Sequence, residues 1–418
     1  MTRPAIVMNM FYTGLGIARS LAEQGISVIG LTAHRGAYGN FTRYAKVLSW
    51  PDTRQQPEAA LAFLLQLGDT LAEGGILFPT RDDDVLFLDR FRVELSRRFV
   101  LVLPEETALT ACLNKWETYR CAEAAGVAVP RCWSVTSSED LHRILPELTF
   151  PCVLKPISAH HWRKGNNWKT VGNRKAIGIF TAEDLLAEYE TIAGADSRAL
   201  LQELIPGGDD CLWIAACYLN RHSNLIAGFT IQKLLQVPEG FGTGCILQTV
   251  DRPDLLATAT ALLQKIQFTG IAEVEFKWDA HSGQYKLIEI NPRPWDQHRL
   301  GKACGVDLIH IAYCDLLGIT LPDIGKQRIG QKWIAEDVFS LRLLQFLWRR
   351  DGRFWSLLKM ARGQRICAVW SIRDPLPLIA FIGTRLGPEL VRHFYRHLRS
   401  LLARFIKGQV RAQERSAL

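Results

Sequence analysis

Two runs late in the chain alternate apolar and polar residues with a period of two, the pattern of a β-strand with one buried face. They cover residues 271–279 (IAEVEFKWD) and 285–296 (YKLIEINPRPWD), and the linker AHSGQ between them contains Gly283. A short glycine-containing linker predicts a hairpin, centred near Ser282. Alternate side chains of a strand point to the same face of a sheet, so the polar residues of each run share one face.

The polar face of this hairpin carries several acids. In the predicted register Glu275 lies opposite Glu289, and Glu273 lies opposite Asn291. Like charges directly opposite each other destabilise a sheet, so this pairing requires a cation. Carboxylate and carbonyl oxygens suit Mg²⁺, with Mn²⁺ as an alternative, and Mg²⁺ takes its other ligands from water and phosphate. The sequence therefore predicts Glu275, Glu289 and Asn291 as metal ligands, against the alternative of a solvated surface hairpin.

Polar residues continue beyond the predicted metal ligands. Arg293 follows Asn291 by two residues and would supply a guanidinium for phosphate oxygens. Asp296, Gln297 and His298 come next, and they either lie near a reacting centre or form a hydrogen-bonded loop without chemistry.

The first part of the chain has a different pattern, in which apolar strands alternate with amphipathic helices. Such alternation predicts a parallel α/β sheet. The turn after the first strand contains only GLG, which is weak support for dinucleotide binding and favours a plain strand-to-helix turn. The predicted strands cover residues 4–10, 26–33, 74–80 and 99–104, and the predicted helices cover about 14–24, 57–71 and 85–96.

Four segments, in this order along the chain, resemble those of the ATP-grasp ligases. LNKWETYRCAEAAGVAVP resembles the segment that opens that fold, with Lys115 matching its first nucleotide-binding lysine. FPCVLKP resembles the strand that carries the second, Lys155, and LLQELIPGGDD is similar to the hinge that holds adenine. IEINPRP, with the second Glu of EVE fourteen residues earlier, resembles the metal-binding end. The resemblance begins near residue 109 and covers about half of the chain.

The resemblance implies a site for ATP, in which two lysines on separate elements reach the triphosphate as point charges. It implies that backbone groups of Leu204 and Ile205 read the adenine edge, with Glu203 close by, and that Asp210 binds ribose. Related ligases place a basic residue between the hinge and the metal strands, and Lys233 is the candidate here.

One segment departs from the family pattern. Where many members have a short glycine-rich loop over the phosphates, residues 157–180 form a long, basic segment that contains tryptophan. Lys175 is the candidate that replaces this loop. The segment either covers the phosphates with side-chain charge or also contacts a bulky acidic substrate.

The fold class implied is α/β and α+β in three parts. Residues 1–108 form a parallel α/β (pre-ATP-grasp) domain, residues 109–318 a two-lobed ATP-grasp domain, and residues 319–418 a basic helical extension. In the first domain Asn9, Arg35 and the acids Asp82 to Asp84 are candidates for binding the acceptor or the carboxylate substrate. Capping of a helix is the alternative role for these aspartates.

The activity implied is an ATP-dependent carboxylate–amine ligase, similar to the D-aspartate ligase branch. The γ-phosphoryl group of ATP would pass to a small-molecule carboxylate, and an amine or similar nucleophile would attack the acyl phosphate. Arg293 would steady the charge that develops during transfer, with Lys233 beside it. The acceptors include cell-envelope or polysaccharide precursors. A bicarbonate-using ATP-grasp carboxylase and a non-catalytic nucleotide-binding scaffold are the alternatives.

Composition and charge add two expectations. The 418 residues predict two or three domains, and ten scattered cysteines without a CxxC pair argue against disulfides and zinc and favour the cytoplasm. No secretory signal is predicted.

The basic residues are concentrated at the C-terminal end. Residues 330–418 contain 17 Lys and Arg against 6 Asp and Glu, so they carry +11, while residues 1–329 carry −3. Basic helical runs at residues 339–362 and 389–411 would suit peripheral contact with an anionic inner membrane surface. Packing on the body with the arginines outward is the alternative, and no motif supports nucleic-acid binding.

Overall fold

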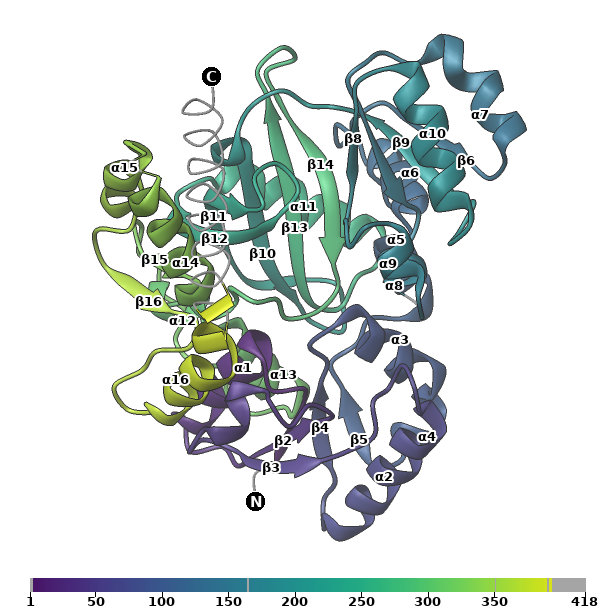
Figure 1. The fold of residues 1–418 in the computed structure, drawn as a ribbon. Helices are drawn as coiled ribbons and strands as arrows, with labels where there is room; N and C mark the ends of the chain where they lie inside the picture. Colours follow the sequence, from purple (N-terminus) through teal and green to yellow (C-terminus); the bar gives the residue numbers. More distant parts are fainter. Residues whose placement is uncertain (1–2, 164, 350, 389–390, 393–418) are drawn as a thin grey trace, which may run out of the picture.

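The N-terminal part of the chain forms a parallel five-stranded sheet in the order β3-β2-β1-β4-β5 (Figure 1). The computed structural model describes residues 3–388 except 164 and 350, together with residues 391 and 392. All four predicted strands are present, which confirms the parallel α/β prediction. The elements are β1 (Ala5–Met8), α1 (Tyr12–Ala22), β2 (Val28–Thr32), β3 (Lys46–Ser49), α2 (Pro57–Thr70), β4 (Gly75–Phe78), α3 (Asp82–Arg90), α4 (Arg92–Leu95) and β5 (Phe99–Leu101).

Two local features of this sheet differ from the sequence pattern. β3 was not predicted, because its four residues KVLS lie at the sheet edge, half-exposed or exposed, and no apolar run marks them. α3 begins at Asp82, three residues before the predicted start, because three aspartates occupy its first turn. Negative side chains are favourable there, since they face the positive end of the helix dipole.

Two further sheets make up the central part of the chain. A four-stranded sheet has the order β6-β9-β7-β8, and a seven-stranded sheet has the order β14-β13-β10-β11-β12-β15-β16. The first comprises β6 (Cys132–Val135), β7 (Cys152–Pro156), β8 (Ile177–Ile179) and β9 (Ala199–Glu203), with α7 (Ser138–Ile144), α8 (Ala159–Arg163), α9 (Asn167–Thr170) and α10 (Ala182–Ala193). The second comprises β10 (Leu212–Leu219), β11 (Leu225–Val237), β12 (Thr243–Val250), β13 (Gly270–Asp279) and β14 (Gln284–Asn291), with β15 (Lys332–Ile334) and β16 (Arg365–Cys367) added later in the chain. The remaining helices of this part are α5 (Glu106–Leu113), α6 (Lys115–Ala124), α11 (Pro253–Lys265), α12 (Arg299–Cys304) and α13 (Leu308–Leu316).

The predicted hairpin is the β13–β14 pair, and its register is confirmed. Glu275 pairs with Glu289 and Glu273 pairs with Asn291, in an antiparallel ladder. The register shifts between Glu275 and Phe276, so the acidic end of the hairpin is offset from the end near the turn. The apolar residues of the other face pack in a buried cluster with α11. This packing fixes which side of the hairpin carries the acids, because a slip of one residue would turn them from the cavity into the apolar cluster.

A single apolar cluster connects the parts of the chain. It includes Val7 of β1, Phe229 of β11 and Trp333 of β15, all completely or almost completely buried. Burial of apolar surface is worth about 25 cal/mol per Å². The N-terminal sheet, the seven-stranded sheet and the C-terminal extension therefore stabilise one another.

The C-terminal extension is only partly helical, which corrects the prediction of a helical extension. α14 (Glu336–Trp348) and α15 (Arg353–Met360) fall on the first predicted helical run. β15 and β16 join the seven-stranded sheet through β12, and strands of three residues carry too short a pattern to be predicted. The second predicted run, residues 389–411, lies outside the described residues except for 391 and 392. The domain boundaries at residues 108 and 318 stay predictions. Among the described residues, no helix has the length and hydropathy needed to cross a bilayer.

A buried ion pair attaches the end of the extension to the N-terminal domain. Nε of Arg19 on α1 donates to Oδ2 of Asp374 at 2.9 Å, and both side chains are almost completely buried. The hydroxyl of Thr42 donates to the same oxygen at 2.6 Å, and the backbone N–H of Arg43 donates to Oδ1 at 3.0 Å. Asp374 directly precedes the turn into α16 (Leu376–Phe381), so these contacts fix the position of that helix.

Asp374→Ala is expected to destabilise the protein, because it leaves the Arg19 guanidinium buried and unpaired. Removal of one partner of a buried pair costs roughly 3–5 kcal/mol. Urea unfolding followed by tryptophan fluorescence measures the change in the free energy of unfolding. Asp351→Ala, which removes an acid from an exposed pair in the same extension, serves as the control. Equal unfolding midpoints for the two variants would contradict this role of Asp374.

Candidate functional site

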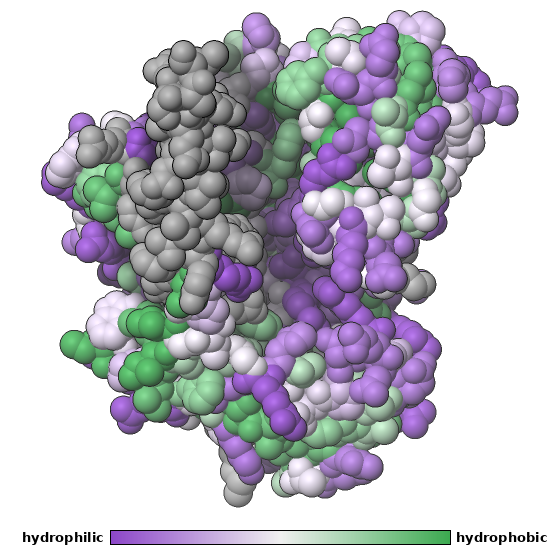
Figure 2. Space-filling model, in the orientation of Figure 1, coloured by the Kyte–Doolittle hydropathy of each residue, from purple (hydrophilic) through white to green (hydrophobic). Residues whose placement is uncertain are grey.

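A cavity of about 390 Å³ lies where the edges of the three sheets come together. Figure 2 shows the centre of this face hollowed and hydrophilic. Its wall holds ten lysines and arginines and five acids, a composition that suits an anionic ligand. The basic residues are Arg54, Arg81, Lys115, Lys155, Arg163, Arg174, Lys175, Lys233, Lys277 and Arg293, and the acids are Asp82, Glu273, Glu275, Glu289 and Asp296.

The three predicted metal ligands meet on this wall, because the hairpin register brings them together. Nδ2 of Asn291 donates to Oε1 of Glu289 at 3.2 Å and to Oε2 of Glu273 at 3.0 Å. Oε2 of Glu275 accepts from Nζ of Lys233 at 2.6 Å. The described residues include no cluster of three or more His, Cys, Asp or Glu suited to a metal ion. The donors nevertheless fit Mg²⁺, which binds one or two carboxylates and completes its shell with water and phosphate.

Glu289 is held in its ionised form by the lysines around it. Burial opposes its ionisation, but Lys115, Lys233, Lys155 and Lys175 around it lower its pKa to about 2. A carboxylate held ionised in this way is available to a cation at neutral pH. The same lysines would repel a free cation. A cation that binds here must therefore arrive with an anion, as Mg²⁺ does when it is bound to a nucleotide.

Glu273 behaves in the opposite way, and sequence reasoning gave it no role beyond pairing. Burial raises its pKa to about 8, Lys233 opposes this rise, and the charges of Glu275 and Glu289 add to it. Two neighbouring acids on adjacent strands are thus driven to different protonation states. Only the three-dimensional packing shows this, because both residues occupy equivalent polar positions on the strand pattern.

Five lysines line the cavity, and four of them come from different segments of the chain. Lys115 opens α6, directly after its N-cap Asn114. Lys155 on β7 is buried, and its Nζ donates to Oε1 of Gln202 at 2.9 Å. Lys175 precedes β8 and donates to the hydroxyl of Thr243 at 2.8 Å, while Lys233 comes from β11. Separate elements surround the cavity, so the lysines can neutralise several phosphates at once.

The pKa of two of these lysines is lowered by loss of water and by neighbouring cations. Burial and the neighbouring Lys115 lower the pKa of Lys155 to about 8. The side chain of Lys175 is exposed, and the partial loss of water around it together with the charge of Arg163 lowers its pKa. A bound anion would raise the pKa of both lysines again, because a nearby negative charge favours the protonated form.

The predicted hinge is only partly on the cavity wall. Leu204 and Ile205, directly after β9, line the cavity. The carboxylate of Glu203 instead pairs with Lys286 on β14. Asp210 is exposed and is not part of the wall, and its carbonyl oxygen accepts from Gln232 at 2.7 Å. The roles of Leu204, Ile205 and Glu203 at adenine and of Asp210 at ribose stay predictions.

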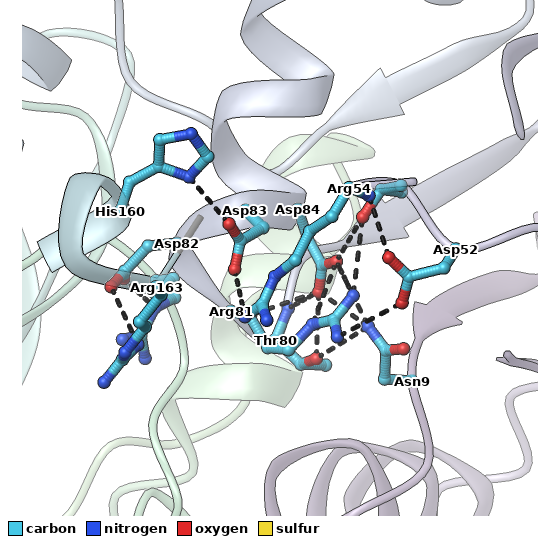
Figure 3. Close-up of polar contacts among 12 residues, drawn as sticks. Asn9, Asp52, Arg54, Thr80, Arg81, Asp82, Asp83, Asp84, His160 and Arg163 are labelled. Carbon is cyan, nitrogen blue, oxygen red and sulfur yellow. Dashed lines mark hydrogen bonds and ion pairs between the residues drawn. The ribbon is translucent and has the colours of Figure 1, made fainter. Parts of the chain in front are cut away.

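The N-terminal domain contributes Asp82 to the cavity wall, and Figure 3 shows the contacts of the acidic turn that carries it. Oδ1 of Asp82 accepts from Nε of Arg293 at 2.6 Å, and Oδ2 lies 3.8 Å from Arg163 of α8. Asp83 accepts from Nδ1 of His160 at 2.8 Å and pairs with Arg54. The turn therefore links Arg293, which follows β14, to Arg163 and His160 of α8. No sequence pattern indicates these pairs, because Asp82 and Arg293 are 211 residues apart.

The third acid of the turn has the capping role named as the alternative. Oδ2 of Asp84 accepts from the backbone N–H groups of Thr80 and Arg81, both at 3.1 Å, at the start of α3. Nδ2 of Asn9 donates to the same carboxylate at 2.9 Å. Arg35 is exposed and is not among the lining residues. The structure thus brings Asp82 to the cavity, and it does not bring Asn9, Asp84 or Arg35 there.

The residues after the metal strand divide into two groups. Asp296 lines the cavity and accepts from the hydroxyl of Thr13 at 2.8 Å, and no described cation lies within 4.0 Å of its carboxylate. Gln297 also lines the cavity and donates to the carbonyl of Gly244 at 3.2 Å. His298 points away, donates from Nε2 to the carbonyl of Thr13 at 3.1 Å, and burial lowers its pKa to about 4. His298 therefore has a structural role, and Asp296 is free to meet a ligand.

Three comparisons with known proteins agree on the kind of fold. Residues 243–324 match the family described as Carbamoyl-phosphate synthase L chain, ATP binding domain. D-aspartate ligase of Enterococcus faecium (strain Aus0004) is 25% identical over 266 residues, which are 60% of this chain and 62% of that one. The chain thus spans less than two thirds of the length of this relative.

Solved structures extend the likeness to most of the chain. Biotin carboxylase of Campylobacter jejuni has a TM-score of 0.63 at 17% identity, over 78% of this chain and 74% of that one. L-amino acid ligase of Bacillus licheniformis has a TM-score of 0.56 at 14% identity, over 75% and 74%. At these identities the likeness shows the fold alone.

ATP binding is expected to weaken as the pH rises through about 8, because Lys155 loses its proton in the ligand-free protein. Binding should be strongest below the pKa of Lys155 in the free protein, and its affinity should fall by up to about tenfold per pH unit above that value. Calorimetric titration with ATP from about pH 6.5 to about pH 9.5, on both sides of the lowered pKa of Lys155, measures the change in affinity. Lys155→Arg stays charged and should remove the dependence. The same slope in both proteins would contradict the role of Lys155.

Glu289→Gln is expected to abolish the Mg²⁺ dependence of nucleotide binding while leaving the fold intact. The substitution removes the carboxylate that four lysines keep ionised. Titration with ATP in the presence of Mg²⁺ and in the presence of EDTA measures the difference between the two affinities. Glu190→Gln, which alters an exposed acid outside the cavity, is the matched control. A Mg²⁺ effect of equal size in both variants would show that the ion is held elsewhere.

Proposed function

This chain is an ATP-grasp superfamily protein, and from that premise we propose that it is an ATP-dependent carboxylate–amine ligase. It would transfer the γ-phosphoryl group of ATP to a carboxylate and join the activated acyl group to an amine. The observation that carries the proposal is the cavity wall on which Glu275, Glu289 and Asn291 stand among four lysines. A set of acids and lysines around one space suits a metal-bound nucleotide.

The residues of the chain act mainly by position and charge. Phosphoryl transfer needs alignment and neutralisation rather than covalent catalysis. Lys115, Lys155 and Lys175 would hold the phosphates. Glu275, Glu289 and Asn291 would hold Mg²⁺, which would supply positive charge to neutralise the phosphates. Arg293 would face the transferring group, held in place by its hydrogen bond to Asp82. Lys233 would orient Glu275 through the 2.6 Å contact between them.

Asp296 is the residue that we assign to the amine. It is the acid of the described cavity wall that has neither a cation within 4.0 Å nor a hydrogen bond to Asn291. An incoming ammonium would find its counter-charge there. The carboxylate of Asp296 takes one proton from the ammonium, which frees the lone pair of the nitrogen. As the neutral amine attacks the acyl carbon, the C–N bond forms and the C–O bond to the phosphate breaks. The phosphate leaves with that electron pair and takes up the second proton that the nitrogen loses. Positioned proton transfer of this kind typically contributes about 10²–10⁴-fold.

The relatives support this class of substrate without identifying the substrate. The printed names D-aspartate ligase and L-amino acid ligase both refer to the joining of amino acids. We therefore include amino acids among the carboxylate and amine substrates, and cell-envelope or polysaccharide precursors among the acceptors. Biotin carboxylase shares the fold, so bicarbonate is the carboxylate of the second candidate function.

ADP release from Mg²⁺ and ATP tests the proposal, with pooled amino acids, other small carboxylates and bicarbonate supplied in turn. The account predicts release that depends on one carboxylate and one amine and is lost in Glu289→Gln. Release driven by bicarbonate alone would favour the carboxylase. ATP binding with no turnover in any pool, including envelope precursors, would favour a scaffold that binds nucleotide.

Asp296→Asn is expected to separate the two halves of the reaction. With the carboxylate that drives ADP release, hydroxylamine should still trap the acyl phosphate as a hydroxamate, because hydroxylamine is largely uncharged at neutral pH and needs no counter-charge. Ligation to the amine should fall by about 10²-fold or more. Asp251→Asn, an exposed acid outside the cavity, is the control. Equal losses of hydroxamate and ligation product would place Asp296 in the phosphoryl-transfer step instead.

A further inference from the structure

A cluster of large apolar side chains stands exposed around α16, far from the cavity in sequence and absent from its wall. We name it the α16 surface. Figure 2 shows hydrophobic residues gathered in this region, at the lower left of the view. Contiguous apolar surface of this kind marks an interaction site more often than chance exposure. Its members and their exposed fractions are Trp370 (44%), Ile372 (83%), Leu376 (55%), Ile379 (62%) and Ile382 (46%).

Spacing explains why these side chains share one face. Leu376, Ile379 and Ile382 recur every three residues, so they lie on one side of the helix. The other side packs inward through Pro377 and Phe381, which are buried. A helix that is apolar on both sides is normally buried on both sides. The outer side of α16 has no apolar partner among the described residues, which points to a partner outside them.

Contacts with the N-terminal domain fix the orientation of α16, so that its outer side faces away from the body of the protein. The carboxylate of Asp374 is fixed by Arg19, Thr42 and Arg43, and Phe381 packs against Tyr38 of η1 (Tyr38–Phe41) with ring centroids 5.5 Å apart. Phe41, at the end of η1, is itself 48% exposed and extends the apolar region. The fold therefore presents this surface in a fixed orientation.

The segment that carries the surface is basic, although the carboxylate of Glu336 on α14 accepts from the backbone N–H groups of Val369 and Trp370 beside it. Residues 370–388 contain one acid, Asp374, which is buried in its ion pair, while Arg373 and Arg43 are exposed. The sequence that follows, residues 389–418, contains seven Lys and Arg against two Asp and Glu. Apolar side chains surrounded by positive charge are the composition of interfacial segments that bind anionic lipid.

The same charges argue against a second copy of the chain as the occupant. A two-fold contact places the same surface on both partners. Arg43 and Arg373 of both copies would then lie in one interface, and positive charges brought together across an interface cost free energy. An anionic bilayer satisfies both the apolar and the basic part of the surface.

We propose that the α16 surface docks on an anionic lipid bilayer as a peripheral contact. Trp370, Ile372 and the outer residues of α16 enter the interface, and Arg43 and Arg373 meet the lipid headgroups. The contact needs no membrane-crossing segment, in keeping with the absence of such a helix from the described residues. It is independent of the ligase proposal, because none of these residues lies on the cavity wall.

Co-sedimentation of the full chain with vesicles tests the proposal. The chain is expected to sediment with vesicles containing phosphatidylglycerol, to be released by high salt, and to stay in the supernatant with pure phosphatidylcholine. Ile372→Ser combined with Leu376→Ser and Ile379→Ser should weaken the binding by about tenfold or more. Val93→Ser combined with Ile319→Ser, which alters exposed apolar residues away from α16, is the matched control and should bind like the wild type.

Three results would overturn the proposal. The wild type could fail to bind phosphatidylglycerol vesicles at all. The triple variant could bind as well as the wild type while deletion of residues 389–418 abolishes binding, which would assign the contact to that segment alone. Sedimentation equilibrium could show a dimer that the triple variant loses, with no lipid binding, which would assign the surface to a second copy. Unchanged ATP affinity and melting temperature in the triple variant confirm that a loss of binding comes from the surface and not from unfolding.

Discussion

The site depends on two carboxylates that the fold places opposite each other in a sheet. Glu275 and Glu289 pair directly across β13 and β14, where like charges repel. The positive charges of the surrounding lysines reduce this repulsion. The cavity wall therefore presents both negative and positive side chains to a ligand. A metal-bound nucleotide carries both signs in one ligand, which is why the arrangement suits it.

The other parts of the structure maintain this arrangement. Apolar packing against α11 fixes the face of the hairpin, and burial separates the protonation of Glu273 from that of Glu289. The N-terminal domain reaches the same place through Asp82, which binds Arg293 and lies near Arg163 of α8. Asp82, from a distant part of the chain, thus both lines the cavity and orients Arg293.

Sequence reasoning predicted the elements whose pattern is local. The alternation of the hairpin was sufficient to predict the register of Glu275 with Glu289, because the turn and the buried face together allow one pairing. It could not predict the pair of Asp82 with Arg293, which depends on how two domains pack. It did not predict β3, β15 or β16, since strands of three or four residues at or near a sheet edge carry no distinct pattern. Asp296 and His298 are two residues apart, and only the structure shows that one faces the cavity and the other the core.

The central claim is that this cavity activates a carboxylate by phosphorylation. The most direct test is to supply the carboxylate substrate labelled with oxygen-18 and to analyse the inorganic phosphate released during turnover. The account predicts that the label passes from the carboxylate to the phosphate, because the acyl phosphate breaks between carbon and oxygen when the amine attacks. Phosphate that carries no label, released at the same rate as the ligation product, would contradict it.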